Sequence, residues 1–452
     1  MMTKSQATLY VPSDTPEAMM MATDKVAGVP IIVRGVMTLA QAGFTHLTLI
    51  IAGTQREKIV NFLARYEDRK LPEIEIVEYD EPYRVSPEVV RRAASSMEGR
   101  ALIINANLLF EKDLIETVRS VKARADEIVV CREGVHPLPI MEIPRSSWEG
   151  LAEFTSVKAR SIESCLKHIL ENAPQAVAQK PAAVNTFLVR RRRDRAVAEK
   201  FLTEAIRHST GGPVAKYINK RFSLPASILL SKMWASPNVI TAINIVIGVF
   251  SGVFAADGHR YDVILLGAVL FQIASIVDGC DGEVAKLTFR SSKFGQYIDS
   301  LSDNLSLGSF MTGLIAGYWR STHNPTAFYV GAVMIFCTAI TLFWMIRFLK
   351  RNTQSASLVT FDKEYLQHLS GQPRWLLTFI RYGKYTLKKD VFSFAFLLFA
   401  AAGVLYWWLF IAAFGTAVSA SILTYLGLRD MARAAPRSNK KVVRIGAEER
   451  VL

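Results

Sequence analysis

The stretch "VDGCDGEVAKLTFRSSKFGQYIDSLSDNL", residues 277–305, places four aspartates in the most apolar half of the chain, and they are Asp278, Asp281, Asp299 and Asp303. The first two are three residues apart and the last two are four apart, so each pair shares one face of a helix. A carboxylate among apolar residues is strongly unfavourable unless a proton or a cation compensates its charge. The stretch therefore predicts two neighbouring helices whose acids bind cations near the surface of an apolar domain.

Long apolar runs surround this stretch, from about residue 236 to residue 428. A helix that crosses a bilayer needs about 20 predominantly apolar residues. We expect an all-α membrane domain over 237–428, whose six spans cover approximately 237–256, 261–282, 295–318, 326–349, 390–405 and 406–428. Before it, residues 206–236 mix apolar residues with Lys216, Lys220, Arg221 and Lys232, which favours an amphipathic juxtamembrane helix.

The distribution of positive charge predicts the orientation in the membrane. The chain carries a formal net charge of +14, and lysines and arginines concentrate in the linker after span four and in the tail 429–452. By the positive-inside rule, the linker 352–389, with an interfacial helix expected at 373–385, and the tail are cytoplasmic. Residues 1–30 are not typical of a secretory signal, so we expect the N-terminal domain on the same side of an inner (cytoplasmic) membrane.

Residues 1–205 have the composition of a soluble domain. Buried strands are predicted at 46–53, 74–79, 101–110 and 127–134, and helices between them at 34–43, 55–66, 87–97 and 112–124. This alternation predicts an N-terminal α/β domain, Rossmann-like, with a parallel sheet covered by helices. The four cysteines have no metal-ligand spacing and are expected to be reduced. The basic run 190–195 is interpreted as a solvated face, so no nucleic acid partner is expected.

The ligand chemistry of the four aspartates favours a hard cation. Sites built from carboxylates alone suit Mg²⁺ or Mn²⁺ better than zinc. Two such ions are the usual arrangement for displacement at phosphorus. The small residues Gly279, Gly282, Ala285 and Gly295 leave room beside the acids for a phosphate, although small residues also serve simply to pack membrane helices. Lys286, Arg290 and Lys293 lie in the same stretch and can neutralise phosphate charge.

The spacing Asp278-x2-Asp281-Gly282-x2-Ala285-Lys286-x8-Gly295-x3-Asp299-x3-Asp303 resembles the signature of the CDP-alcohol phosphotransferases. The run "SPNVIT" (236–241) also resembles the entry to the first span of that family. One position departs from the signature, because the family usually has arginine where this chain has Lys286. Lysine keeps the positive charge of arginine but lacks the planar guanidinium group, which can donate two parallel hydrogen bonds to one phosphate.

The resemblance implies a reaction and a set of roles. A CDP-linked donor would bind with its pyrophosphate on two ions held mainly by Asp278, Asp281 and Asp299. Asp303 would bind metal and act as general base on the acceptor hydroxyl, and CMP would leave. The CDP pocket would be lined by Asp278, Gly282, Ala285, Lys286 and Gly295. Lys293 and Arg347 are the candidate contacts for an acceptor that carries a phosphate, and the family's usual assembly implies a homodimer.

The segment "VAGVPIIVRGVMTLAQAGFTHLTLIIAG" (26–53) resembles the nucleotidyltransferases that act on sugar phosphates. The whole chain resembles fusions of an inositol-1-phosphate cytidylyltransferase with a di-myo-inositol phosphate phosphate synthase. The N-terminal half departs from an active pattern, because the expected glycine-rich phosphate loop reads "YVPSDTPEAMMMATDK" (10–25) and contains no glycine. Asn107 stands where a metal-binding aspartate is expected, and only Lys25 is retained.

An inactive first domain implies that the CDP-linked donor is made elsewhere. We expect transfer from CDP-diacylglycerol to a polar alcohol or alcohol phosphate at the bilayer, in phospholipid synthesis. The alternative is transfer from CDP-inositol to inositol phosphate, with or without cytidylyltransferase activity in the first domain. A cation transporter is a remote alternative, since intramembrane acids also mark ion pathways, but these acids cluster at one end of two helices.

Overall fold

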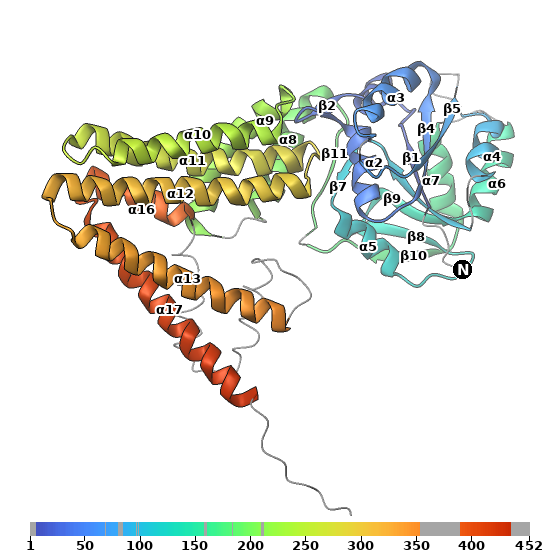
Figure 1. Ribbon diagram of the computed structural model, residues 1–452. Helices are drawn as coiled ribbons and strands as arrows, with labels where there is room; N and C mark the ends of the chain where they lie inside the picture. The colour runs from blue at the N-terminus through green and yellow to red at the C-terminus, as the bar shows by residue number, and fades with distance from the viewer. Residues whose placement is uncertain are drawn as a thin grey trace, which may run out of the picture. The chain divides into compact units, whose positions relative to one another are not determined.

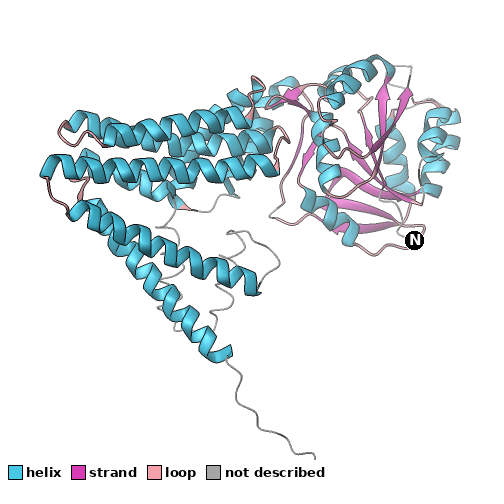
Figure 2. Cartoon of the chain, viewed as in Figure 1, coloured by secondary structure: helices cyan, strands magenta, loops and turns pink. Residues whose placement is uncertain are grey.

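A computed structural model of the 452-residue chain describes residues 6–67, 69–79, 85–95, 97, 99–157, 161–182, 184–208, 212–352 and 389–434. Its contacts divide the chain into two compact units. The first comprises Met1–Gly211, Lys216–Thr241 and Val277–Ile298, and the second comprises Gly212–Ala215, Ala242–Ile276 and Asp299–Leu452. Every strand among the described residues belongs to the first unit, and the second is helical (Figures 1 and 2).

A seven-stranded sheet forms the centre of the first unit, in the order β10-β8-β9-β6-β1-β4-β5. The strands are β1 (Gln6–Tyr10), β4 (His46–Ala52), β5 (Glu73–Tyr79), β6 (Arg100–Asn105), β8 (Ile128–Glu133), β9 (His136–Pro144) and β10 (Gln175–Gln179). Strands β6, β1, β4 and β5 are parallel, as are β8 and β10. The expectation of a wholly parallel sheet is wrong at β9, which runs antiparallel to both β6 and β8.

Helices cover both faces of the sheet, which is why its central strands are apolar along their whole length. They are α1 (Pro16–Met21), α2 (Ile31–Gln41), α3 (Arg56–Ala64), α4 (Pro87–Ser95), α5 (Lys112–Ser120), α6 (Arg145–Val157), α7 (Ile162–Asn172) and α8 (Arg195–His208). One apolar core contains residues of α2, α3 and α5, and the other contains residues of α4, α6 and α7. The four predicted strand regions and the four predicted helices of this domain are all present.

Two small antiparallel pairs and a juxtamembrane helix complete the first unit. The pairs are β2 (Lys25–Val26) with β3 (Val29–Pro30), and β7 (Leu108–Phe110) with β11 (Thr186–Leu188). The π-helical turn η3 (Ala215–Asn219) leads into α9 (Lys220–Lys232), where the juxtamembrane helix was predicted.

Six further helices coincide with the six predicted spans. They are α10 (Pro237–Ala255), α11 (Tyr261–Leu287), α12 (Lys293–Thr322), α13 (Thr326–Asn352), α16 (Lys389–Ala401) and α17 (Trp407–Ala434). Of the described helices, three are long and apolar enough to cross a membrane, namely Pro237–Ala255, Tyr261–Leu287 and Trp407–Arg429. The number of spans therefore remains a prediction, and the interfacial helix expected at 373–385 and the tail beyond residue 434 lie outside the described residues.

Helices α10 and α12 contact each other through small residues. A Cβ atom added at Gly252 would overlap with the backbone of Ser309, and one added at Gly313 would overlap with the backbone of Gly252. About two turns earlier on each helix, Asn244 Nδ2 donates to Ser302 Oγ at 3.1 Å. Contacts therefore advance in the same direction along both helices, which run parallel with their backbones in close approach.

An aromatic cluster joins α11, α12 and α16 in the second unit. The rings of Phe271 and Phe310 stack with their centroids 4.6 Å apart, and Phe396 lies 4.8 Å from Phe310. All three side chains are fully buried. This cluster fixes the packing of the helices that carry the predicted acids.

Candidate active site

The first pair of predicted acids lies near the C-terminal end of α11. Asp281 is only 4% exposed, and its Oδ2 accepts a hydrogen bond of 2.5 Å from Thr241 Oγ1 on α10. Its Oδ1 accepts from the backbone N–H of Gly282, also at 2.5 Å. Asp278, one turn earlier, is half-buried. The hydroxyl on α10 thus fixes the orientation of a carboxylate that would otherwise be buried with too few partners.

The start of α12 carries the predicted glycine. Ser292 Oγ accepts from the N–H of Gly295 at 2.9 Å and so caps the first turn of the helix. A Cβ atom at Gly295 would lie 3.4 Å from Asn238 Oδ1, in the first turn of α10. The first turns of α10 therefore contact both the end of α11, through Thr241, and the start of α12, through Asn238.

The second pair of acids lies further along α12. Asp299 and Asp303 are both half-buried, and Nζ of Lys389, the first residue of α16, lies 2.5 Å from Oδ1 of Asp303. Sequence reasoning counted Lys389 only as one positive charge of a linker. The positively charged ammonium group of Lys389 therefore lies against Asp303, which is a predicted metal ligand.

The chemistry of the donors fits a hard divalent cation, because four carboxylates and no sulfur or imidazole ligand belong to the set. The ammonium of Lys389 already occupies a cation position at Asp303. Among the described residues, no three His, Cys, Asp or Glu side chains are close enough to form a metal-binding group. The four-aspartate metal site therefore remains a prediction.

A fifth acid in the same stretch was missed from the sequence. Glu283 is 2% exposed, and its Oε1 accepts from Lys220 Nζ at 2.6 Å and from Ser223 Oγ at 2.5 Å, both on α9. Lys220 was counted among the basic residues of an amphipathic helix, and it forms an ion pair with Glu283 that is largely buried. Gly279 lies beside this pair. A Cβ atom added at Gly279 would lie 3.4 Å from Glu283 Oε1 and 3.7 Å from Lys220 Nζ. The pair holds α9 against the acid-bearing end of α11.

The predicted basic residues lie in different places. Lys286 is exposed and lines a cavity of the first unit together with residues of the N-terminal domain. Lys293 is exposed as the first residue of α12, and Arg347 is exposed on α13. The predicted roles of these three residues in CDP or acceptor binding are untested by this arrangement.

In the N-terminal domain, the segment aligned with a phosphate loop is folded into the core. Helix α1 occupies 16–21, and Met21 packs against Leu109 and Ala198 in an apolar cluster. Asn107 is 1% exposed, and its Nδ2 donates to the carbonyl of Ala18 at 2.7 Å. The segment 10–25 is therefore hydrogen-bonded to Asn107, the residue that stands where a metal-binding aspartate was expected.

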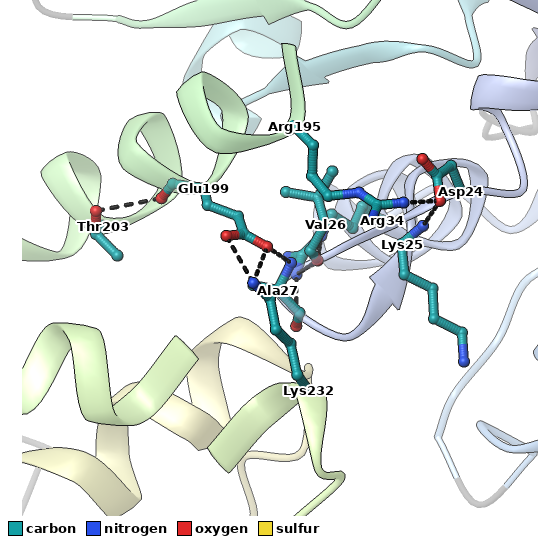
Figure 3. Close-up of polar contacts among 9 residues, drawn as sticks. All are labelled: Asp24, Lys25, Val26, Ala27, Arg34, Arg195, Glu199, Thr203 and Lys232. Carbon is teal, nitrogen blue, oxygen red and sulfur yellow. Dashed lines mark hydrogen bonds and ion pairs between the residues drawn. The ribbon is translucent and has the colours of Figure 1, made fainter. Parts of the chain in front are cut away.

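Lys25 makes no contact with these groups. Its side chain points away from Asp24 and Arg195 in Figure 3, and its Nζ lies 5.4 Å from the centroid of the Phe62 ring. Asp24 is paired with Arg195, and it also accepts from the backbone N–H of Lys25 at 2.9 Å. Lys25 is thus an exposed residue at the start of a short hairpin.

That hairpin contacts the juxtamembrane helix. Gly28 has a φ of +80°, and a Cβ atom there would overlap with the backbone carbonyl of Ser231 on α9. Glu199 accepts from the N–H of Ala27 at 3.2 Å and pairs with Lys232 at 2.9 Å (Figure 3). The turn between β2 and β3 is therefore fitted against the end of α9, within the first unit.

Comparison with known proteins finds a family match that includes the predicted site. Residues 234–419 match the model of the CDP-alcohol phosphatidyltransferase family. The match includes all four aspartates and the first turns of α10.

Curated relatives match this chain over part of their own length, which is less than a third for the relative from Thermococcus kodakarensis. The bifunctional IPC transferase and DIPP synthase of Thermococcus kodakarensis is 31% identical over 137 residues, which cover 29% of this chain and 30% of the relative. The protein of that name from Aquifex aeolicus is 22% identical over 327 residues, 67% of this chain and 72% of the relative. The CDP-diacylglycerol–serine O-phosphatidyltransferase of Helicobacter pylori (strain J99) is 35% identical over 92 residues, 20% of this chain and 37% of the relative.

The Aquifex match is longer than the family domain and so extends into other parts of the chain. The chain as a whole resembles these bifunctional proteins. Among solved structures, the inositol-1-phosphate CTP transferase from T. maritima aligns with a TM-score of 0.34 and 10% identity, covering 42% of this chain and 91% of that chain. A similarity at this level carries no argument about function.

Proposed function

We propose that the chain transfers a substituted phosphate group from a CDP-linked donor to the hydroxyl of a polar alcohol or alcohol phosphate. The supporting observation is that the first turns of α10 contact both segments of the signature, through Thr241 with Asp281 and Asn238 with Gly295. These contacts support a site at the ends of α11 and α12, beside the four aspartates. The match of residues 234–419 to the CDP-alcohol phosphatidyltransferase family supports this reaction.

The roles follow from the chemistry of each side chain. Asp278, Asp281, Asp299 and Asp303 would hold two Mg²⁺ or Mn²⁺ ions, which supply charge neutralisation at the pyrophosphate when bound. Gly282 is exposed and Gly295 and Ala285 are half-buried, so they present little side-chain bulk to a CDP moiety. Asp278 completes the proposed CDP contacts, and Lys293 and Arg347 are the proposed acceptor contacts. Lys286, expected at the CDP from the resemblance, lines a separate cavity of the first unit and is left out of this proposal.

Asp303 is proposed as the general base. Its carboxylate takes the proton of the acceptor hydroxyl as the acceptor oxygen forms a bond to the β-phosphorus. The bond from that phosphorus to the oxygen that bridges it to the α-phosphate breaks, and CMP leaves with this oxygen. Lys389 lies against Asp303, so its ammonium group holds this carboxylate in place before the donor binds.

The proposed donor is CDP-diacylglycerol, made by another enzyme, which gives a phospholipid product at the membrane. The folded loop at 16–21 and the burial of Asn107 support an inactive first domain. CDP-inositol is the alternative donor, favoured by the similarity to the bifunctional relatives over 67% of this chain. We further propose six spans, a cytoplasmic first domain and tail, and a homodimer.

The test uses the full-length protein in lipid nanodiscs with Mg²⁺ or Mn²⁺. CMP release is followed with CDP-diacylglycerol or with CDP-inositol, each with a panel of alcohols and alcohol phosphates. A third reaction contains CTP and inositol 1-phosphate and is assayed for pyrophosphate. CMP from the lipid donor supports the main proposal, and CMP from CDP-inositol alone supports the alternative. No CMP from either donor contradicts both.

Asparagine variants of the four aspartates, with a matched control, test which residues take part in the reaction. Asp278→Asn, Asp281→Asn and Asp299→Asn should abolish CMP release and weaken Mn²⁺ binding. Asp303→Asn should lower turnover by about 10²–10⁴-fold, the range for loss of a general base, while CDP still binds. Asp262→Asn is the control, because Asp262 lies at the other end of α11 and its side chain is 67% exposed. Unchanged turnover in Asp303→Asn would contradict the proposal that Asp303 acts as the general base.

A further inference from the structure

A cavity with space for about 170 Å³ of solvent lies within the first unit, away from the aspartates of α11. Its walls come from α2, β7, α8 and the segment that ends α11. Apolar side chains such as Leu109, Ile206 and Phe289 form most of the lining, and the polar groups are Arg34, Thr38 and Lys286. The lining contains no acid. A single water needs only about 10–15 Å³ of such space, so the cavity has room for a small molecule.

Arg34 is the buried cation of this cavity. It is 4% exposed, and its Nε and Nη2 donate to the carbonyl of Val26 at 3.2 and 2.7 Å (Figure 3). Nη2 also reaches the carbonyl of Ala27 at 3.4 Å. Within the described part of the chain, Nη1 has no hydrogen-bond partner and no carboxylate forms an ion pair with the guanidinium. Burial lowers the pKa of Arg34 to about 10.

A buried charge without a counter-charge is unfavourable by several kcal/mol, which is why buried arginines are usually paired with acids. The side chain of Arg34 is held in place by two backbone carbonyls and by the ring of Phe289, 5.7 Å away. Its two free N–H groups on Nη1 are the donors still available to a ligand. Glu199 acts on the charge of Arg34 without forming an ion pair with it, and is itself paired with Lys232. An anionic ligand would therefore supply the direct partner that Arg34 lacks.

Lys286 supplies a second positive charge at the same cavity. It follows Asp281 by five residues on α11, which places it roughly 140° further around the helix axis. Its position in the cavity lining agrees with this, since it faces residues of α2 and α8. One buried and one exposed cation together match a group that carries close to two negative charges.

We propose that this cavity binds a phosphomonoester with a short apolar body. Such a group carries about −1.5 to −2 charges near pH 7 and offers three acceptor oxygens. The Nη1 group of Arg34 would donate to two of these phosphate oxygens. Lys286 would contact the phosphate from the exposed side of the cavity. The apolar walls would contact the apolar part of the ligand. The space is below the usual 300–1,000 Å³ of drug-sized sites, so the buried part of the ligand is small. The ligand is either a soluble phosphomonoester or the headgroup of a lipid phosphomonoester.

The test measures binding to the full-length protein in nanodiscs of phosphatidylcholine. Butyl phosphate is titrated by calorimetry, with 1-butanol as the uncharged probe. In a second arm the nanodiscs contain phosphatidate, and butyl phosphate is titrated again to detect competition. Binding of butyl phosphate but not butanol supports a soluble source, and competition by phosphatidate supports a lipid source. No binding of butyl phosphate together with no effect of phosphatidate on the unfolding temperature overturns the proposal.

Three variants separate the site from general folding. Arg34→Met removes the buried charge and should abolish binding, and Lys286→Met, at an exposed position where folding is not at risk, should weaken it at least about tenfold. Ala205→Phe places a ring in the cavity with both cations kept, and should also abolish binding. Arg56→Met, at an exposed arginine paired with Glu78, is the control. Wild-type affinity in Lys286→Met and Ala205→Phe would overturn the proposal even if Arg34→Met did not fold.

Discussion

The ammonium of Lys389 lies 2.5 Å from Oδ1 of Asp303, across 86 residues of sequence. The contact joins the start of α16 to the last acid of the signature on α12. Lysine and a divalent cation use the same carboxylate oxygens, so at this position they compete. In the proposed metal site, the strength of metal binding would therefore be set in part by a residue outside the signature.

Replacing this lysine should strengthen metal binding. In Lys389→Met, the Mg²⁺ concentration that gives half-maximal CMP release should fall by roughly tenfold, equivalent to about 1.4 kcal/mol. Lys200→Met, at an exposed lysine of α8, is the control and should leave the metal dependence unchanged. A higher Mg²⁺ requirement in Lys389→Met would instead assign Lys389 to binding of the donor phosphates.

The buried pair of Lys220 and Glu283 should be important for stability. Their side chains are 12% and 1% exposed, so Lys220→Met leaves an uncompensated carboxylate between α9 and α11. The free energy of unfolding in mixed micelles should fall by about 3–5 kcal/mol, as for other buried pairs broken on one side. The double variant Lys220→Met/Glu283→Gln should recover most of the loss.

The exposed pair of Arg260 and Asp262 is the matched control for that measurement. Both of its side chains are about two-thirds exposed, at 68% and 67%. Solvent screens such a pair, so Arg260→Met should have little effect on unfolding. Equal effects of Arg260→Met and Lys220→Met would contradict the structural role of the buried pair.

The turn at Gly28 should tolerate no side chain. Gly28 and Gly43 have φ angles of +80° and +86°, so alanine at either position carries the same backbone penalty of about 1–2 kcal/mol. Only at Gly28 would the new Cβ overlap with α9, because no atom lies within 4 Å of the Cβ position at Gly43. Gly28→Ala should therefore lower the unfolding temperature well below that of Gly43→Ala, and equal temperatures would show that the turn and α9 separate freely.

The first domain should not be reactivated by one carboxylate. In Asn107→Asp, the amide nitrogen that donates to Ala18 is replaced by an oxygen facing a carbonyl, which should destabilise the domain by about 1–3 kcal/mol. Pyrophosphate release from CTP and inositol 1-phosphate should stay absent. Lys25→Ala should match the wild type in CMP release, and pyrophosphate release by the wild-type chain, lost in Lys25→Ala, would contradict an inactive domain.

Stability of the first domain should fall as pH rises. Burial raises the pKa of Glu163 from 4.5 to about 7, and Asp14 adds to the shift. Because the folded-state pKa is the higher one, this group stabilises the fold fully below pH 4.5, and the contribution is lost as pH rises through 7. The unfolding temperature should therefore decrease between pH 5 and pH 8. Glu163→Gln should flatten the decrease, and Glu171→Gln, at an exposed acid of the same helix, should not.

The parts of the fold that depend on local spacing were predictable from the sequence. The intervals between Asp278 and Asp281 and between Asp299 and Asp303 place each pair on one helix, and both helices are present. Strand β9 was missed because Pro137 and Pro139 argue against a strand with a paired neighbour on each side. Pro137 and Pro139 lie at the start of the strand, before the residues from Ile140 onward that pair with β6.

The partners of the acids could not be predicted from spacing. Thr241 is 40 residues from Asp281, Lys220 is 63 from Glu283 and Lys389 is 86 from Asp303. Each pairing depends on how whole helices pack, and a periodic pattern along one helix contains no such information. The run "SPNVIT" included Thr241, but the sequence alone gave its hydroxyl no partner.

The close contact of α10 with α12 limits which parts of the catalytic domain can move during a reaction cycle. Where two backbones touch at Gly252 and Gly313, turning either helix about its own axis would drive a larger neighbouring side chain into the other. The two helices are therefore expected to move together as one rigid pair. In the proposed reaction, substrate entry and product departure would then be accommodated by movements of other helices.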